Sequence, residues 1–381
     1  MMPAPFPPTI RAPRILRITL QDFRSYAALD RGVGARLVAL TGENGAGKTN
    51  VLEALSMFSP GRGLRRAEIG DCARKDGAGA FAVSIEIEAD GFVTQLGHGY
   101  APGDGRRFRI DRAPIASAGA FAEHLRVLWL TPDMDGLFRG PAGDRRRWLD
   151  RLALGVDAEH GARAAKLERA LRNRNRLLEE GCEDRRWLEA AEQEIAALGV
   201  AVAAARRETV LRLSALIEAQ RDDASPFPFA RIAIEGDLEM ALGARSALEV
   251  EEDFRARLKA SRRRDAAAGR ALFGPQTSDL LVRHGPKDEA AKVCSTGEQK
   301  ALLVGLSLAH ARLVAAMTGT APLLLMDEIA AHFDEKRRAA LYDELEALGG
   351  PVWMTGADPE LFAPIAGRAE VLRVSPGQIG D

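Results

Sequence analysis

The stretch GENGAGKTN, residues 42–50, fits the pattern G-x-x-x-x-G-K-[ST], which is typical of loops that wrap phosphate groups. A short apolar run at residues 36–42 precedes the loop, and residues 48–58 follow it with apolar side chains at helical spacing. The motif needs this order of strand, loop and helix, because backbone N–H groups and the helix N-terminus then point at anionic oxygens. The sequence therefore predicts a nucleotide-binding site near the start of the chain.

Each part of this loop has an expected role in binding ATP. The glycines let the backbone approach the phosphates closely, Lys48 is expected to reach the β- and γ-phosphates, and the Thr49 hydroxyl is expected to bind Mg²⁺. The predicted ATP-binding residues are Gly42, Glu43, Asn44, Gly45, Ala46, Gly47, Lys48 and Thr49.

The segment LLLMDE, residues 323–328, has the character of a buried strand that ends in two acids. Asp327 is expected to hold Mg²⁺ through water, and Glu328 to orient or deprotonate the attacking water. Glu328 and Lys48 are therefore the predicted catalytic residues. The alternative is an acidic pair that merely ends a strand, and the phosphate-loop motif in the same chain disfavours it.

The segment CSTGEQK, residues 294–300, resembles the signature loop of ABC-type ATPases. Taken alone it equally fits a helix cap, with Ser295 or Thr296 at the cap and Glu298 in the first turn. Its position shortly before LLLMDE favours the signature loop, which in such enzymes binds the γ-phosphate held by the opposite subunit. The resemblance implies that Ser295, Gly297 and Gln299 act in trans, with ATP bound between two copies of the chain.

Composition limits the other possibilities. The 381 residues carry a net charge of −1, so any DNA-binding surface must come from clustered arginines rather than from overall charge. The three cysteines are far apart, which argues against disulfides or a zinc site and favours a reducing compartment. No apolar run is long enough to span a membrane and the start does not look like a signal peptide, so we expect a cytoplasmic protein. The candidate DNA-binding residues are Arg65, Arg66, Arg145, Arg146 and Arg147, for which plain solvated charge is the alternative.

The order of patterns along the chain predicts an α/β fold. Residues 14–29 alternate like one strand, residues 80–112 read as meandering strands, and residues 160–222 read as two helices packed back on each other. Strand and helix then alternate again toward the C-terminus, which indicates a P-loop ATPase domain split in sequence by an inserted helical lobe. The expected divisions are a disordered tail at 1–13, the two parts of the ATPase domain at 14–150 and 266–381, and the lobe at 151–265.

Six segments, in order over nearly the whole chain, resemble the bacterial RecF family. They are LQDFRSY, TGENGAGKTNVLEALSMFSPGRGLRRA, RGPAGDRRRWLDRL, LRNRNRLLEEG, STGEQKALLVGLSLAH and LLLMDEIAAHFD. Two departures stand out. The family's G-P-H-R-D-D-L pattern is GPQTSDL here, with Gln276 and Thr277 in place of His and Arg, and its Ser-Glu-Leu-Asp stretch is AHFD, in which Asp334 matches.

The resemblance implies an ATP-dependent DNA-binding protein of recombinational repair and replication that takes part in the response to DNA damage. RecF-like proteins recognise gapped DNA near junctions of single and double strands. With RecR, and alongside RecO, they promote loading of RecA. The resemblance further implies an ATP-driven homodimer and a weak, DNA-stimulated ATPase that acts as a switch rather than a motor.

Two other kinds of function remain open at this stage. Other ABC-type ATPases include SMC-like proteins, which need long coiled coils, and overcoming-lysogenisation-type nucleases, which carry an extra carboxylate-rich domain; neither feature is found here. Lys48 and Ser295 are some 250 residues apart, far more than in transporter ATPases, which lack an inserted lobe and carry a histidine that MTGAD at 354–358 lacks. A structural adaptor that binds ATP without hydrolysing it is the second alternative, and Glu328 argues against it.

Overall fold

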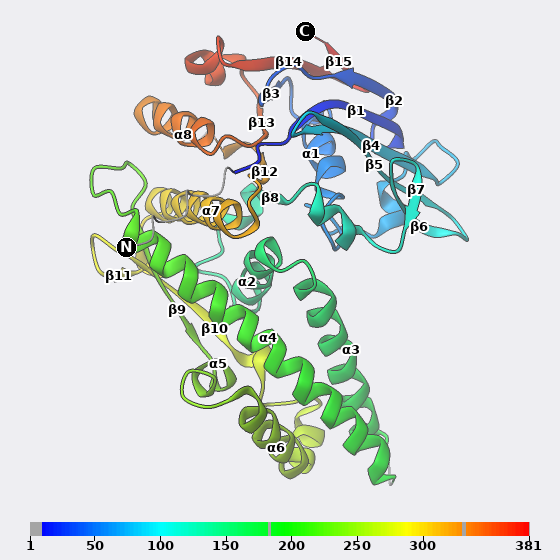
Figure 1. Cartoon of the computed structure of the whole chain (residues 1–381), viewed down its shortest axis with the longest axis vertical. Helices are drawn as coiled ribbons and strands as arrows, with labels where there is room; N and C mark the ends of the chain where they lie inside the picture. Colours follow the sequence, from blue (N-terminus) through cyan, green and yellow to red (C-terminus); the bar gives the residue numbers. More distant parts are fainter. Residues whose placement is uncertain (1–9, 182–183, 330–332, 381) are drawn as a thin grey trace, which may run out of the picture. The chain divides into compact units, whose positions relative to one another are not determined.

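The computed structural model describes residues 10–181, 184–329 and 333–380, and the chain divides into two compact units (Figure 1). Unit 1 comprises Met1–Asp135, Ala224–Phe227 and Leu303–Asp381, and unit 2 comprises Gly136–Asp223 and Pro228–Leu302. This division does not test the domain boundaries expected from the sequence, which stay a prediction. Most of the predicted tail at 1–13 lies outside the described residues.

Unit 1 contains a mostly parallel sheet with the strand order β15-β14-β3-β13-β12-β8, in which β15 alone runs antiparallel to its neighbour. Every residue of β3, β8, β12 and β13 is buried, as expected for parallel strands that are covered on both faces. β14 and β15 were not foreseen from the sequence. The strands are β3 (Leu37–Thr41), β8 (Val127–Leu130), β12 (Leu323–Met326), β13 (Val352–Gly356), β14 (Ala369–Ser375) and β15 (Gln378–Gly380).

A second sheet of unit 1 is antiparallel, with the order β2-β1-β4-β5-β6-β7. Burial alternates along β1 and β4, so one face of the sheet packs into the apolar core and the other faces outward. Phe81 on the inner face makes edge contacts with Phe23 and with His98. The strands are β1 (Arg14–Phe23), β2 (Tyr26–Gly32), β4 (Phe81–Ala89), β5 (Phe92–Ala101), β6 (Gly105–Ile110) and β7 (Ala113–Ile115).

The expectation of one strand over residues 14–29 is wrong, because the chain reverses there. Phe23 pairs with Tyr26, and both side chains are fully buried, so the apolar pattern continues across a turn that no glycine or proline marks. Arg24 takes a left-handed backbone with φ of 53°, and its N–H donates to the Cys72 carbonyl at 2.9 Å. This tertiary hydrogen bond holds a turn that local sequence does not favour.

Three helices accompany the sheets of unit 1: α1 (Lys48–Ser56), α8 (Glu335–Ala347) and α7 (Thr296–Thr318), whose first turns belong to unit 2. By length and apolar composition α7 could cross a membrane, but 67% of its most apolar window is buried inside the structure. The core helix of a soluble protein can be equally long and apolar. α7 is the apolar helix that precedes LLLMDE in the chain.

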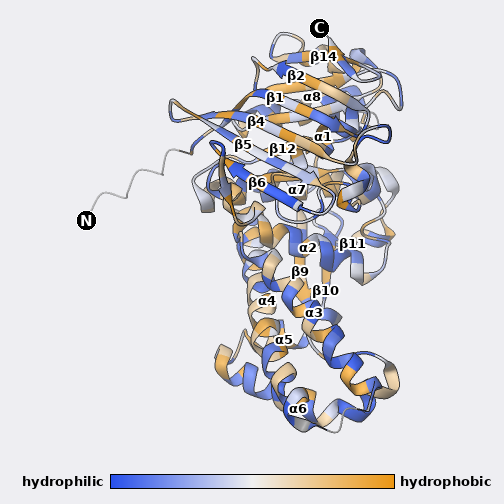
Figure 2. Ribbon diagram, turned by 90° about the vertical axis from the view of Figure 1, so that its right-hand side faces the viewer, coloured by the Kyte–Doolittle hydropathy of each residue, from blue (hydrophilic) through white to orange (hydrophobic). Residues whose placement is uncertain are grey.

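In its described residues, unit 2 combines α2 to α6 and the first turns of α7 with a small antiparallel sheet of order β11-β10-β9. As predicted, two helices pack back on each other: α3 and α4 share a core with α6 that includes Leu171, Ile195 and Phe254. Their ribbons in Figure 2 alternate between hydrophobic and hydrophilic residues, as amphipathic helices do. α4 is a single helix of 35 residues. The elements are α2 (Ala142–Val156), α3 (His160–Glu179), α4 (Arg185–Ala219), α5 (Asp237–Ala241), α6 (Ala247–Ala268), β9 (Ala230–Glu235), β10 (Asp279–His284) and β11 (Glu289–Ala290).

Candidate ATP site

The phosphate loop of unit 1 connects the end of β3 to the start of α1. Gly42, Gly45 and Gly47 have φ of 139°, 85° and 113°, a backbone that side chains with a Cβ rarely adopt. A Cβ on Gly42 would also lie 2.3 Å from the Val374 carbonyl oxygen. Glycine at 42 is therefore required twice, by its dihedral angle and by close packing against β14.

The Lys48 ammonium lies inside this loop. Its Nζ donates to the carbonyl oxygens of Gly42 at 2.6 Å and Glu43 at 2.9 Å, and the residue is 4% exposed. Tyr26 also contacts the loop, because its hydroxyl donates to the Gly47 carbonyl at 3.2 Å. Burial raises the pKa of that Tyr26 hydroxyl, so it stays protonated and able to donate.

The second predicted element meets the loop at the carboxyl ends of two strands of the parallel sheet. The Thr49 hydroxyl donates to Asp327 Oδ1 at 3.0 Å, which joins residues 278 positions apart in sequence. β12 ends just before Asp327 and β3 ends just before the loop, and β13 is the strand between them. Ligand sites of open α/β sheets lie at such strand ends.

Thr355, at the end of β13, is a site residue that the sequence interpretation missed. Its hydroxyl donates to Asp327 Oδ1 at 2.7 Å and accepts the backbone N–H of Glu328 at 2.9 Å. Glu328 has φ of 51°, a left-handed backbone that is uncommon for a residue other than glycine and that is typical of functional positions. The sequence signal for Thr355 is a threonine at the end of an apolar run, in MTGAD at 354–358. We used that segment only for its missing histidine.

Glu53, on α1, is a second missed residue. It is fully buried, and Arg24 donates to its two oxygens at 2.8 and 2.6 Å. Arg65 donates to the same carboxylate at 3.1 Å and to the Asn50 side chain at 2.7 Å. These bonds tie the helix behind the phosphate loop to the turn between β1 and β2.

The signature segment lies in unit 2 at the start of α7. Ser295 and Glu298 form a reciprocal cap, in which Ser295 N–H and hydroxyl donate to Glu298 at 2.9 and 2.8 Å and Glu298 N–H donates back at 3.4 Å. Lys287 pairs with the same carboxylate, and the hydrogen bonds from Lys287 and Ser295 lower the pKa of Glu298 to about 2. The helix cap and the signature pattern therefore coexist in the same residues.

Two further contacts hold the signature segment. Gln299 is 2% exposed and its Nε2 donates to the Cys294 carbonyl at 2.7 Å. Arg139, which the sequence interpretation did not single out, donates to the same carbonyl at 2.9 Å. A Cβ on Gly297 would meet nothing within 4 Å, so the backbone of this turn is open to approach.

The candidate DNA-binding arginines fall into different environments. Arg145 donates to both oxygens of Asp279 at 2.7 Å and to the Gly140 carbonyl at 2.6 Å, and Arg146 donates to the Ser278 carbonyl at 2.7 Å. These two guanidinium groups hold α2 against β10, and the selection of Arg145 and Arg146 as DNA contacts stays a prediction. Arg147 pairs with Asp144 on the surface, and Arg65 is partly exposed beside Glu53. Arg66 has φ of 57° in the loop that follows.

The two departures from the family pattern have simple local outcomes. Gln276 donates to the Phe273 carbonyl at 2.9 Å and Thr277 to the Gly274 carbonyl at 2.7 Å, so this uncharged pair serves its own loop. In AHFD, Ala331 and His332 lie outside the described residues. Asp334 caps α8 by accepting the Arg337 N–H at 2.8 Å.

The chain is similar to known proteins over most of its length. The family model described as "RecF/RecN/SMC N terminal domain" matches residues 14–350. The "DNA replication and repair protein RecF" of Mesorhizobium japonicum is 52% identical over 369 residues, covering 96% of this chain and 97% of the relative. The protein of the same description from Rhizobium meliloti is 51% identical over 368 residues, covering 96% and 98%.

Solved structures show the fold. A structure described as "the recombination mediator protein RecF-ATPrS in RecFOR pathway" superposes with a TM-score of 0.82 at 19% identity, over 98% of this chain and 99% of that one. An Smc head domain derived from Pyrococcus furiosus gives a TM-score of 0.53 at 17% identity, over 97% and 95%. The predicted ABC-type ATPase fold is thus confirmed. About half of the residues of this chain are identical to those of RecF proteins over nearly the full length. The chain therefore belongs to the RecF family.

Proposed function

We propose that this chain is an ATP-dependent DNA-binding protein of recombinational repair and replication, in which ATP switches the protein into its DNA-bound state. The observation that carries the proposal is the hydrogen bond from Thr49 to Asp327, which joins the phosphate loop around Lys48 to the acidic end of β12. The relatives support the biological setting, because they are named for DNA replication and repair. The proposed location is the cytoplasm.

The chain's own residues support a division of work at the nucleotide. Phosphate oxygens would replace the carbonyls of Gly42 and Glu43 as partners of the Lys48 ammonium. Glu328 is the proposed base that orients or deprotonates water, and its backbone direction is held by the Thr355 hydroxyl. Slow hydrolysis at Glu328 would then release the protein from DNA.

Mg²⁺ fits the oxygen atoms at this point. The Thr49 hydroxyl and the Asp327 carboxylate lie 3.0 Å apart, and both are ligands that this hard cation prefers. The described residues contain no group of three or more His, Cys, Asp or Glu that could hold a metal, but Mg²⁺ bound jointly by protein and phosphates does not need one. When bound, the ion would neutralise charge on the β- and γ-phosphates.

We further propose that two copies enclose each ATP. Ser295, Gly297 and Gln299 of one copy would bind the γ-phosphate that Lys48 of the other copy holds. A helix N-terminus with an open glycine and a serine hydroxyl suits an anion, and ATP then favours the dimer by its differential affinity for it. The dimer would engage gapped DNA and, with RecR and alongside RecO, promote RecA loading.

The first test measures binding of fluorescent gapped and blunt duplex DNA with ATP, with ADP and without nucleotide. We expect tight binding with ATP alone, and tighter binding to the gapped duplex. Lys48→Ala should keep its melting temperature but lose nucleotide-dependent binding, whereas Lys75→Ala, a change of an exposed lysine of the same unit, should behave as wild type. Equal binding without ATP would contradict the switch, and retained ATP affinity in Lys48→Ala would contradict the loop assignment.

The second test addresses the dimer. Ser295→Arg should bind ATP as a monomer, because the long side chain occupies the place of the partner's γ-phosphate. Mixing Ser295→Arg with Lys48→Ala protein should restore part of the ATPase activity, since one of the two composite sites then carries neither change. A mixture without activity, made from two folded variants, would overturn the assignment of Ser295 in trans.

A further inference from the structure

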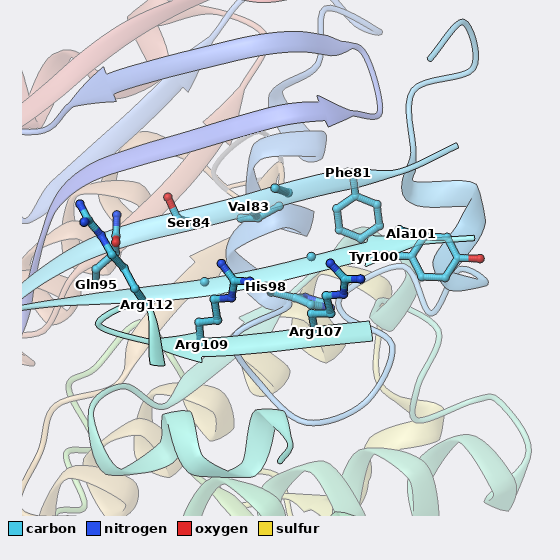
Figure 3. A pocket seen from close by; sticks show the side chains of 13 residues that line it. Phe81, Val83, Ser84, Gln95, His98, Tyr100, Ala101, Arg107, Arg109 and Arg112 are labelled. Carbon is cyan, nitrogen blue, oxygen red and sulfur yellow. The ribbon is translucent and has the colours of Figure 1, made fainter. Parts of the chain in front are cut away.

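The outer face of the antiparallel sheet in unit 1 carries a hollow of about 320 Å³ over β4, β5 and β6 (Figure 3). It is distinct from the phosphate loop and contains none of the arginines selected from the sequence. Three arginines line it: Arg107 and Arg109 on β6, and Arg112 in the turn after it. Figure 2 shows β6 as the most hydrophilic strand of this sheet.

The floor of the hollow is made of small residues in register with the arginines. One row across the sheet runs Ser84, Gly97, Arg109, and the next runs Ala82, Gly99, Arg107. Residues two apart on a strand share a face and are about 7 Å apart along it. The two arginines therefore stand side by side beyond a floor that has no large side chain.

Three aromatic residues line the hollow, Phe81, His98 and Tyr100, and their rings are buried or partly buried. Phe81 and His98 are 4% and 2% exposed, and they pack on the inner face of the sheet. Burial, and then the charge of Arg106, lower the pKa of His98 to about 3, so the imidazole adds no charge at neutral pH. Tyr100 also lines the hollow, but it is partly buried and its ring lies 6.0 Å from that of Phe81, so the hollow offers no freely exposed aromatic platform for stacked bases.

The charge of the hollow is cationic and largely uncompensated. Its lining residues include no Asp or Glu. Arg107 pairs with Asp104 at the edge, but Arg109 and Arg112 are exposed and have no hydrogen bond or ion pair within the part of the chain that the structure describes. Guanidinium groups in this state match phosphate oxygens by charge and by their planar geometry.

The backbone at Arg112 is held in a costly conformation. Asp111 and Arg112 have φ of 48° and 69°, the two positive values of a tight hairpin turn in which glycine is favoured at the second position. The turn is fixed to β5, because Asp111 N–H donates to the Gln95 carbonyl at 2.8 Å and Gln95 N–H donates to Asp111 Oδ1 at 2.7 Å. Arginine at this position makes the turn less stable than glycine would, and its side chain makes no contact that stabilises the described part of the fold.

We propose that this hollow binds the phosphate backbone of duplex DNA through Arg109 and Arg112, with Arg107 at its edge. The inference rests on the proposed function, which it deepens by naming the surface and the form of DNA. Duplex is chosen over single-stranded DNA because single-strand sites combine a basic groove with exposed aromatic rings, whereas the rings that line this hollow, those of Phe81, His98 and Tyr100, are buried or partly buried. An acidic peptide is disfavoured because the floor lacks anchors.

The test measures binding of a fluorescent duplex in ATP over a range of salt concentrations. Arg109→Ala and Arg112→Ala should each reduce the slope of the log binding constant against the log salt concentration by about 0.9. The loss of affinity relative to wild type should therefore be roughly eightfold larger at 0.1 M salt than at 1 M salt. Arg109→Lys should keep most of the slope, since the charge remains. Arg36→Ala, which removes another exposed arginine next to the parallel sheet, should change neither.

Two variants separate binding from folding. Gly97→Val should fill the floor without changing charge, because a Cβ there meets only Arg109 Cβ, at 3.7 Å, and the residue is favoured in strands. Arg112→Gly relieves the turn, so its melting temperature should equal or exceed that of wild type while duplex binding falls. A structural role for Arg112 predicts the reverse pair of results.

The outcomes separate this inference from the proposed function. If wild type fails to bind any DNA in ATP, the proposed function itself is wrong. If wild type binds but Arg109→Ala, Arg112→Gly and Gly97→Val all bind duplex normally, the hollow is not a DNA surface. Loss confined to a single-stranded probe would overturn the choice of duplex. ATP hydrolysis without DNA should be unchanged in all three variants.

Discussion

Two arginines, one in each unit, show opposite uses of this residue type. In unit 2, Arg174 is fully buried and donates to Glu192 at 3.1 Å, to Asp265 at 2.8 Å and to the Leu258 carbonyl at 2.6 Å. In unit 1, Arg109 stands on an exposed sheet face and no partner for it is found among the described residues. One residue type thus stabilises a core in one place and displays charge in the other.

The difference shows why clustering in the sequence is a poor guide to surface charge. The densest selected run, residues 145–147, lies on a helix, where consecutive side chains point in different directions. Two of its three guanidinium groups therefore turn inward to Asp279 and the Ser278 carbonyl. Arg107 and Arg109 are separated by Phe108, yet strand alternation puts both on one face.

The largest effect is expected for Arg174→Ala. Removing one partner of a buried ionic network leaves Glu192 and Asp265 without full compensation, at a cost of about 3–5 kcal/mol in the free energy of unfolding. Urea denaturation measures the total, and hydrogen exchange of α3 and α6 localises it. Arg172→Ala on the same helix removes an exposed pair with Glu168 and should cost less than about 0.5 kcal/mol. Similar stability of the two variants would show that Arg174 is not structural.

Much of the fold follows from local pattern. The buried runs of β3, β12 and β13 and the amphipathic α3 and α4 were predictable, because each has the period of its structure. The turn at Arg24 was not, since a tertiary hydrogen bond to Cys72 holds it. β14 packs against Gly42 from the far end of the chain, which is a long-range contact that no local pattern announces.

The candidate site divides in the same way. Lys48, Thr49 and Asp327 belong to motifs whose residue types and spacing are dictated by phosphate chemistry, so the sequence indicated them together. Thr355 and Glu53 act through a single hydrogen-bonding group each, and only the sheet order and the turn at Arg24 show what they contact. Supporting residues of this kind are visible only once strands are placed side by side.

An intermediate effect is expected at Asp150, which accepts from Arg206 at 2.7 and 2.9 Å and from His160 at 2.8 Å. Burial raises the pKa of Asp150, but these hydrogen bonds outweigh it and hold the pKa below its usual value. The lower folded pKa stabilises the protein above about pH 4, and this contribution is lost as pH falls through the folded value.

Asp150→Asn tests this contribution. At pH 7 it should cost about 2 kcal/mol, because Arg206 loses a charged partner. The difference in unfolding free energy between wild type and variant should shrink steadily as pH falls through the range in which Asp150 takes up its proton. Glu159→Gln, a nearby change on the surface, should show no such convergence. A difference that stays constant with pH would mean that the charge of Asp150 does not contribute.

The smallest effects are expected within the arginine run itself, where Arg145 and Arg147 differ by two positions. Arg145→Ala should cost about 1.5–3 kcal/mol of unfolding free energy, because Asp279 loses a bidentate charged partner that is largely shielded from solvent. Arg147→Ala should stay within about 0.5 kcal/mol, since its pair with Asp144 is exposed. Duplex binding should respond in the opposite order. Measured on folded protein, Arg145→Ala should leave the salt slope unchanged, whereas Arg147→Ala should reduce it by one unit at most. A slope that falls in Arg145→Ala and not in Arg147→Ala would mean that the Asp279 pair opens when DNA binds, and the contrast between buried and displayed arginines would then not hold at this helix.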